Sequence, residues 1–435
     1  MKLEIKDSQN YAATIIQVPK PHKLTNSDRL YGITVFGMTA VVNDAWQDKE
    51  GDLAVFFPAE CQISDAFASH ANLYRHSELN ADPNEVGYLE DSRRVRALKL
   101  RGNVSNGLII PLYVLEMFVG DSGCFNEGDT FDAVGGVEVC RKYRLKEPQV
   151  AVSREGKKLA KAFKRVDEKM LPEHIDTDQW LRNKGLVGHG DMLVVTQKLH
   201  GTSVRLANTI VKRKLTFLER IAKRLGAKVA ETEFDYIAGS RKVIKDPKST
   251  TQDHFYSSDI WTKKLQQVQT LIPRNFILYG EMVGFTEGGQ PIQKGYTYEA
   301  SYKESDLYIY RVAVVNDEGA LYDLSWDQVR KFCMERGLEH TPELWRGLRT
   351  HFELSDFEEK NFHSVERTAR NSWGQGWYVD VPVSLSSDVS DEGIVIRVDR
   401  GQPVPLLLKF KNPSFYLHET EMLDGGVIDM ESDES

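Results

Sequence analysis

The chain has 435 residues, a net charge of −8 and 41% hydrophobic residues, enough for two domains with cores of their own. No apolar run approaches the ~18 residues of a membrane span, and the first residues carry no signal-peptide pattern, so we expect no membrane span and no membrane partner. The four cysteines (Cys61, Cys124, Cys140 and Cys333) are scattered, which argues against a zinc site or a disulfide framework and favours a cytoplasmic protein in a reducing compartment.

The negative net charge argues against a nucleic-acid partner, but the charges are unevenly distributed. Residues 419–435 hold seven acidic residues and no Lys or Arg, so they account for most of the excess. Residues 141–169 hold eleven Lys or Arg against four acids, and residues 212–228 hold seven against one. These two basic belts suit contact with a phosphate backbone. Solvated helix faces would explain them equally well.

Residues 1–135 are expected to form mostly strands. Apolar and β-branched runs alternate there with polar, Gly-rich stretches, and five strands in this length favour a small barrel of the OB type. The expected strands are 12–18, 30–42, 52–58, 95–101 and 108–112. A cluster of basic residues lies on or beside one of them: Arg94, Arg96, Lys99 and Arg101. We predict that this cluster binds nucleic acid, although a solvated barrel face would look the same.

Residues 136–185 are interpreted as a basic linker with a helix over 154–169. A second domain follows over 186–418, with helices expected at 217–225 and 326–336 and strands at 276–279, 307–315, 393–398 and 406–410. The acidic residues 419–435 are expected to form a mobile tail.

Lys198 is the first candidate catalytic residue. It follows an apolar strand, Met192–Val195, and precedes Gly201, which would allow a backbone to approach a phosphate. A lysine attacks only when deprotonated, and nearby cations favour deprotonation. Lys409 and Lys411 alternate with Phe410, so both lie on one face of their strand and could supply those cations and grip a phosphate. A solvent-facing strand with protective lysines is the alternative.

Glu281 and Glu392 are candidate binding residues because both lie within apolar, strand-like sequence. A carboxylate in such a place is costly unless it is paired or binds a metal. One could hold a sugar hydroxyl and the other a divalent ion. Structural ion pairs with the lysines would account for either residue alone.

The four segments around Lys198, Glu281, Glu392 and Lys409 occur in an order that resembles the covalent nucleotidyltransferase superfamily of ATP-dependent ligases and capping enzymes. The chain is similar to the nick-sealing RNA ligase 2 family, which has His where DNA ligases usually have Asp, and His200 matches that position. The resemblance implies that Lys198 becomes adenylylated, that Glu281 contacts the ribose, and that Glu392 is linked to the divalent metal.

The resemblance implies further nucleotide contacts. Lys409 and Lys411 match the paired lysines that bind the phosphate, and Gly201 and Arg205 belong to the nucleophile motif. Arg241, in Ser240-Arg241, matches a short phosphate-binding element. Tyr310 matches the aromatic residue that stacks on the purine, but Arg311 replaces the acid that usually follows it. His200 could orient either the nucleotide phosphates or a metal-bound water.

Domain order separates the members of the superfamily. DNA ligases and capping enzymes generally carry an OB domain after the last lysine motif, whereas here only 24 residues follow Lys411. The order resembles a branch of RNA ligases with an N-terminal OB module. We therefore expect an α+β protein, with an N-terminal OB-type β-barrel and a nucleotidyltransferase domain of antiparallel sheets flanked by helices.

The resemblance implies an ATP-dependent RNA ligase that uses Mg²⁺ or Mn²⁺ and acts as a monomer on nicked duplexes with an RNA 3′-OH end. It would work through lysyl-AMP and AMP-capped 5′-end intermediates. Two alternatives remain at this point. One is an RNA-capping guanylyltransferase, and the other is a non-catalytic nucleic-acid-binding protein with an OB module.

Overall fold

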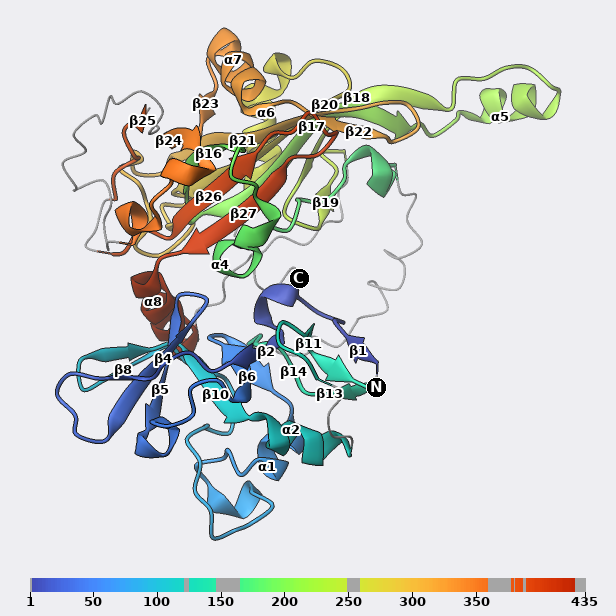
Figure 1. Cartoon of the computed structure of the whole chain (residues 1–435). Helices are drawn as coiled ribbons and strands as arrows, with labels where there is room; N and C mark the ends of the chain where they lie inside the picture. Colours follow the sequence, from blue (N-terminus) through green and yellow to red (C-terminus); the bar gives the residue numbers. More distant parts are fainter. Residues whose placement is uncertain are drawn as a thin grey trace. The chain divides into compact units, whose positions relative to one another are not determined.

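The computed structural model describes residues 2–120, 125–145, 165–248, 259–358, 377–378, 380–385 and 389–426 of a mixed α+β chain (Figure 1). The chain divides into two compact units. The first comprises Met1–Leu145, Asp178–Lys184 and Lys411–Ile428, and the second comprises Lys146–Thr177, Gly185–Phe410 and Asp429–Ser435.

The described part of the first unit contains five small antiparallel sheets. The largest has the order β10 (Gly107–Pro111), β6 (Leu53–Pro58), β2 (Ala13–Gln17), β11 (Thr130–Phe131). The others are β3 (His22–Lys23), β4 (Leu30–Val35) and β5 (Met38–Asn43); β1 (Leu3–Glu4), β12 (Ala133–Val134) and β13 (Val137–Glu138); β14 (Cys140–Lys142) and β7 (Cys61–Ile63); and β8 (Leu98–Leu100) and β9 (Asn103–Ser105). Within the described residues none of these sheets closes on itself, so the expected barrel is not found.

The strand expected over 30–42 is in fact a hairpin. Phe36 and Gly37 both have positive φ, at 50° and 74°, and turn the chain between β4 and β5. Both strands contribute apolar residues to one core, with Ile33, Val35 and Met38 buried, so the two strands resemble one long run in the sequence.

Four helices complete the first unit in its described part: α1 (Asp65–His70), α2 (Leu112–Val119), α4 (Trp180–Asn183) and α8 (Pro413–Asp424). Helix α8 begins with Asn412 as its N-cap and Pro413 in its first turn, and it buries Phe415, Tyr416 and Thr420. The expectation of a mobile tail from residue 419 is therefore wrong for residues 419–424, because they form the end of this packed helix.

In its described part, the second unit is built on two mainly antiparallel sheets. The larger has the order β19 (Ile244–Lys245), β18 (Thr232–Gly239), β17 (Thr202–Lys212), β20 (Phe276–Gly284), β21 (Ser305–Val315), β22 (Leu321–Asp323). A short strand, β23 (Glu339–His340), adds to β21 in parallel. The strands that the second unit contributes to the second sheet are, in order, β27 (Leu406–Lys411), β26 (Gly393–Val398), β16 (Met192–Lys198), β24 (Glu343–Leu348) and β25 (Trp377–Tyr378).

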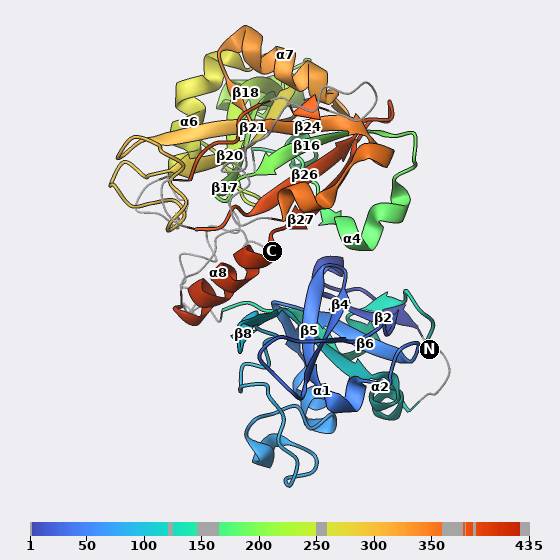
Figure 2. The same ribbon diagram turned by 60° about the vertical axis from the view of Figure 1, so that its left-hand side comes forward.

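Two helices, α6 (Ile260–Val268) and α7 (Trp326–Arg336), cover one face of the larger sheet (Figure 2). Trp261 of α6 and Trp326 of α7 are fully buried against alternate residues of the strands, such as Leu206 and Leu278. The sequence-based bounds of α7 agree with the structure, because Ser325 and Gln328 form a capping box and Gly337 ends the helix with φ of 63°.

The opposite face of the same sheet packs against residues that precede the second unit's first strand. Val166, Met170 and Leu171 join a core with Tyr279 and Ala313. The helix expected over 154–169 lies largely outside the described residues. In its described part, residues 165–169, there is no α-helix; only the short 3-10 helix Glu168–Met170 begins there.

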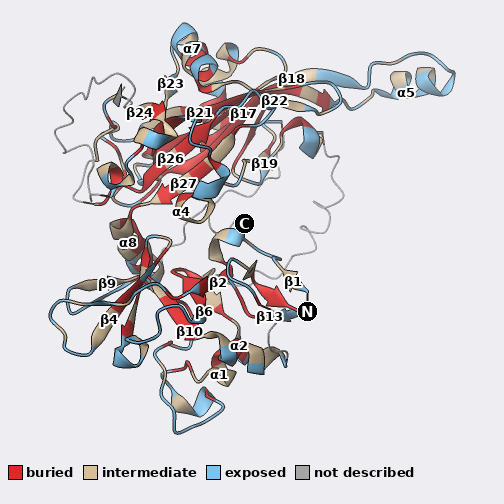
Figure 3. Cartoon of the chain, in the orientation of Figure 1, coloured by how far each residue is buried: buried red, intermediate tan, exposed pale blue. Residues whose placement is uncertain are grey.

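Helix α5 (Phe217–Arg224) lies at the outer end of the long β17–β18 hairpin (Figure 1). It is held by local interactions. Thr216 and Glu219 form a capping box, Arg213 Nη2 lies 2.6 Å from Glu219 Oε1, and Gly226 follows with φ of 86°. No residue of α5 is buried, in contrast to the strands that carry it (Figure 3). Every helix in the described part of the chain is too short or too polar to cross a bilayer.

Candidate active site

Lys198 and Glu392 meet because β16 and β26 are neighbouring strands. Lys198 is the last residue of β16 and pairs with Gly393, the first residue of β26. Lys198 Nζ lies 2.7 Å from Glu392 Oε1, with the Lys198 side chain 20% exposed and the Glu392 side chain 4% exposed. The fold therefore places the candidate nucleophile against a buried carboxylate that lies almost 200 residues away in the sequence.

His200 lies on the other side of the same carboxylate. Its Nδ1 is 3.8 Å from Glu392 Oε2, and its ring meets Tyr296 edge-on at 4.8 Å. Its backbone N–H donates a 2.8 Å hydrogen bond to the Tyr298 hydroxyl. These contacts orient His200 toward Glu392. Its role, to orient either the nucleotide phosphates or a metal-bound water, remains a prediction.

Gly201 lies where two backbone segments approach closely. A Cβ at this position would lie 2.2 Å from the carbonyl oxygen of Met282, so only glycine fits. The Gly201 N–H donates to Glu281 Oε1 at 3.0 Å, and the Ser203 hydroxyl donates to Glu281 Oε2 at 3.4 Å. Glu281 thus ties β20 to the nucleophile motif, and its contact with a ribose remains a prediction.

The two predicted arginines have different environments. Arg205 is 1% exposed, and its Nε and Nη1 atoms donate to the carbonyl oxygens of Ser240 and Leu171, each at 2.8 Å. Arg241 is partly exposed, and its Nη2 donates to Asp176 at 2.7 Å. Arg205 is thus bonded to Leu171, in the segment that precedes Asp176. Arg241 is the more accessible candidate for binding a phosphate.

Tyr310 is half-buried, and its hydroxyl lies 2.7 Å from His174 Nδ1. The unexpected Arg311 beside it does not face solvent. Its Nε donates to Asp323 Oδ1 at 2.8 Å, both side chains are at most 2% exposed, and the guanidinium lies 4.1 Å from the Tyr279 ring centroid. Burial raises the pKa of Asp323, although Arg311 opposes that shift. Arg311 is therefore part of a buried ion pair.

Lys409 and Lys411 alternate with buried residues in β27, as the sequence predicted. Both lysines are half-buried, whereas Leu408 and Phe410 are buried. Lys411 belongs to the first unit, where its Nζ lies 2.9 and 3.1 Å from the two carboxylate oxygens of Glu419 in α8. Binding of a nucleotide phosphate by either lysine remains a prediction.

The residues around Glu392 fit a divalent ion only as a partial ligand set. Among the described residues, no group of three or more His, Cys, Asp or Glu side chains could hold a metal ion. Glu392 Oε2, however, is buried and accepts no hydrogen bond from any residue that the structure describes. Mg²⁺ commonly binds one or two carboxylates and completes its shell with water and substrate phosphates, which is compatible with Glu392 as the protein ligand.

The predicted nucleic-acid cluster in the first unit is only partly exposed. Arg94 is 3% exposed, and it pairs with Glu60 at 3.1 Å and Asp424 at 3.0 Å, so its predicted contact with nucleic acid is wrong. Arg96 also pairs with Asp424, at 2.8 Å. Lys99 and Arg101 are exposed on the β8–β9 hairpin, and they remain candidates.

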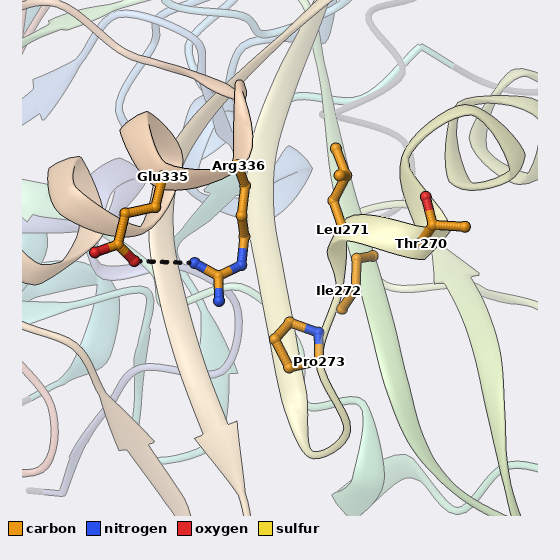
Figure 4. Close-up of a pocket in the computed structure, with 6 residues that line it drawn as sticks. All are labelled: Thr270, Leu271, Ile272, Pro273, Glu335 and Arg336. Atoms are coloured by element: carbon orange, nitrogen blue, oxygen red, sulfur yellow. Dashed lines mark hydrogen bonds and ion pairs between the residues drawn. The ribbon is translucent and has the colours of Figure 1, made fainter.

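The sequence analysis did not identify Gln293, Tyr296 and Tyr298, which contact the loop that follows Lys198 (residues 199–201, the nucleophile loop). It also did not identify His174, which contacts Tyr310. They lie in irregular segments without periodicity, so no pattern in the sequence marks them. A shallow cavity of about 490 Å³, lined by residues 270–273, Glu335 and Arg336, contains none of the predicted site residues (Figure 4).

Comparison with known proteins supports the family assignment that was drawn from the order of the motifs. The family model described as RNA ligase matches residues 191–412, just over half of the chain. No curated protein sequence matches this chain.

Solved structures of the Naegleria gruberi RNA ligase resemble almost the whole chain. A Lys-to-Met mutant with AMP and manganese has 16% identity and a TM-score of 0.56, and covers 94% of this chain and 98% of its own. The ligase with pyrophosphate has 16% identity and a TM-score of 0.56, with 94% and 99% covered. A Lys-to-Ala mutant with ATP and manganese has 16% identity and a TM-score of 0.53, with 95% and 99% covered. At this identity the likeness establishes the fold.

Proposed function

Because the chain belongs to the RNA ligase family, we propose that it is an ATP-dependent RNA ligase that joins 3′-OH and 5′-phosphate ends at nicks. The observation that carries the proposal is the 2.7 Å contact between Lys198 Nζ and Glu392 Oε1 at the end of two paired strands. It brings together the residues that the motif order assigns to covalent attachment and to the divalent ion.

The reaction proceeds in three transfers. Lys198 Nζ, after losing a proton, attacks the α-phosphorus of ATP, and the bond to pyrophosphate breaks, which leaves lysyl-AMP. A 5′-phosphate oxygen of the RNA then attacks the same phosphorus and releases Lys198. In the last transfer the neighbouring 3′-OH attacks the capped 5′-phosphate, so that a phosphodiester bond forms and AMP leaves.

Fixed charges hold the phosphates through these transfers. Lys409 and Lys411 would bind the α-phosphate, and Arg241 would bind a second phosphate group. Glu392 would hold Mg²⁺ or Mn²⁺, which, when bound, neutralises the charge that develops on the phosphates. The structures of the Naegleria gruberi RNA ligase with ATP or AMP and manganese support ATP and this type of ion as co-substrate and cofactor.

Incubation with α-labelled ATP and Mg²⁺ or Mn²⁺ should leave label on the protein, and Lys198→Ala should abolish it. Lys212→Ala is the matched control, since Lys212 is an exposed residue at the far end of β17 and should label normally. Label that persists in Lys198→Ala overturns the assignment. Labelling by GTP instead of ATP would identify a capping guanylyltransferase, and tight RNA binding without any label would identify a non-catalytic binding protein.

For the first unit we propose an OB-type role in gripping a nicked duplex with an RNA 3′-OH end, through the exposed Lys99 and Arg101. Changing both to Glu should reduce the sealing of nicks and make sealing less dependent on salt concentration, while self-adenylylation stays normal. Equal loss of both activities would indicate a structural role instead. A panel of nicks with RNA or DNA on each side tests the 3′-OH preference.

We further propose that the enzyme is a cytosolic monomer. The free, buried thiols of Cys61, Cys140 and Cys333 suit a reducing compartment. Sedimentation of the purified chain tests the monomer.

A further inference from the structure

The loop between β20 and β21 contacts the residues that follow Lys198. This loop covers residues 285–304, and loops of this length in a compact unit are commonly functional. Gln293 Nε2 donates to the carbonyl oxygen of Gly201 at 2.9 Å. Five residues later, the hydroxyl of Tyr298 accepts the backbone N–H of His200 at 2.8 Å. The loop thus holds the nucleophile loop at two consecutive residues.

Tyr296 connects the same loop to the other half of the site. Its hydroxyl donates to the carbonyl oxygen of Ser390 at 2.7 Å, two residues before Glu392. Its ring also packs edge-on against His200, with the ring planes at 87°. The loop, through Gln293, Tyr296 and Tyr298, therefore contacts both His200–Gly201 and Ser390, which lie next to the contact between Lys198 and Glu392.

The conformation of this loop is determined by its surroundings. Gln293, Tyr296 and Tyr298 are at most 6% exposed. Tyr298 and the following Glu299 have φ values of 49° and 61°, a region that bulky residues rarely adopt unless packing holds them there. Burial also raises the pKa of Tyr298 well above its usual value, so its hydroxyl stays protonated. A segment held in this way can keep the two segments that it contacts at a fixed separation.

We infer that Tyr296 and Tyr298 are positioning residues that set the separation between Lys198 and Glu392, and that Tyr298 has the larger effect because it bonds the nucleophile loop directly. The inference rests on the proposed function for its kinetic consequence. Its structural content, a tie between the two segments, stands on the hydrogen bonds alone and can be tested without activity.

The variants are Tyr298→Phe and Tyr296→Phe, which remove one hydroxyl each and keep the ring. Tyr302→Phe is the matched control, because Tyr302 belongs to the same loop, is 67% exposed, and keeps its ring contact with Phe285 when changed to Phe. In Tyr298→Phe the His200 N–H loses its acceptor, so amide hydrogen exchange in the segment 199–203 should accelerate. In Tyr296→Phe the acceleration should appear in the segment 389–392.

The kinetic readout is self-adenylylation, with kcat and KM for ATP measured separately. A displacement of reacting groups by about 1 Å can lower a rate by roughly 100-fold, so Tyr298→Phe should lower kcat by roughly 10- to 100-fold. KM should change little, because the substituted hydroxyls make no predicted contact with ATP. A purely structural role would instead lower the active fraction without this kcat-specific loss in the folded protein.

Normal exchange at 199–203 together with a normal kcat in Tyr298→Phe would overturn the inference, as would equal effects in Tyr302→Phe. If the wild-type chain forms no lysyl-nucleotide, the proposed function fails, but the exchange comparison still decides whether the tie exists. The two failures are therefore distinguishable.

Discussion

Replacing Gly201 with alanine tests how closely the nucleophile loop must pack. The new Cβ would lie 2.2 Å from the carbonyl oxygen of Met282 and 2.9 Å from Val283 Cγ1, so relief of both contacts requires a shift of roughly 1 Å. That shift would lengthen the hydrogen bonds that Gly201 makes with Glu281 and Gln293, now 3.0 and 2.9 Å. Each buried hydrogen bond contributes about 1 kcal/mol, so we expect a loss of about 2 kcal/mol in stability.

The same shift should move Lys198 relative to Glu392, so the rate of lysyl-AMP formation should fall by about 100-fold. A single-turnover experiment with excess α-labelled ATP measures this rate, and thermal unfolding measures the stability. Gly190→Ala is the control, since a Cβ at Gly190 meets nothing within 4 Å and should leave both measurements unchanged. A Gly201→Ala variant that labels at the wild-type rate would refute the reasoning, because the close approach to Met282 would then have no influence on the nucleophile.

Three further outcomes are expected. Arg311→Met should destabilise the second unit by about 3 kcal/mol in chemical denaturation, because it leaves Asp323 buried without its partner; a loss below about 1 kcal/mol would contradict the buried pair. Burial, followed by the nearby Glu419 carboxylate, raises the pKa of Glu60 to about 7, while Arg94 opposes the shift less strongly. Because the folded state then holds this proton more tightly, Glu60 contributes stability that is fully present below pH ~4.5 and is lost as pH rises through ~7. Glu60→Gln should therefore remove this pH dependence of stability, which amide hydrogen exchange in α8 measures. Leu218→Asp on α5 should leave the unfolding midpoint unchanged, since Leu218 is 75% exposed, and a large destabilisation would show that α5 has a packing partner.

Patterns that act over a few residues predicted the structure well. The alternation of Lys409 and Lys411 with Phe410 in β27 and the expected helix over 326–336 agree with the structure, because strand faces and helical periodicity depend on neighbouring residues. The assignment to the RNA ligase family also followed from local motifs, and the family comparison confirms it. The structure brings Lys198 and Glu392 together, which the motif order had implied without giving a distance.

Features that depend on distant partners could not be predicted. Arg94 was assigned to an exposed basic cluster because its local sequence is basic, but its neutralising partner Asp424 lies more than 300 residues later. Arg311 was an unexplained departure from the motif until the structure paired it with Asp323. The turn at Phe36 was missed because a non-glycine residue with positive φ has no reliable sequence signal.

The division of the chain between two compact units has a consequence for biosynthesis. The first unit needs both Met1–Leu145 and Lys411–Ile428, so residues 146–410, 265 in all, must be translated between its two main parts. At about 5–20 residues per second, that interval lasts tens of seconds. During this time Thr420, which donates to Glu60, and Asp424, which pairs with Arg94, have not yet been made. Until then Glu60 and Arg94 have, among the described residues, only each other as ion-pair partners and lack their contacts with α8, and the sheets of the second unit can form on the ribosome before the first unit is complete.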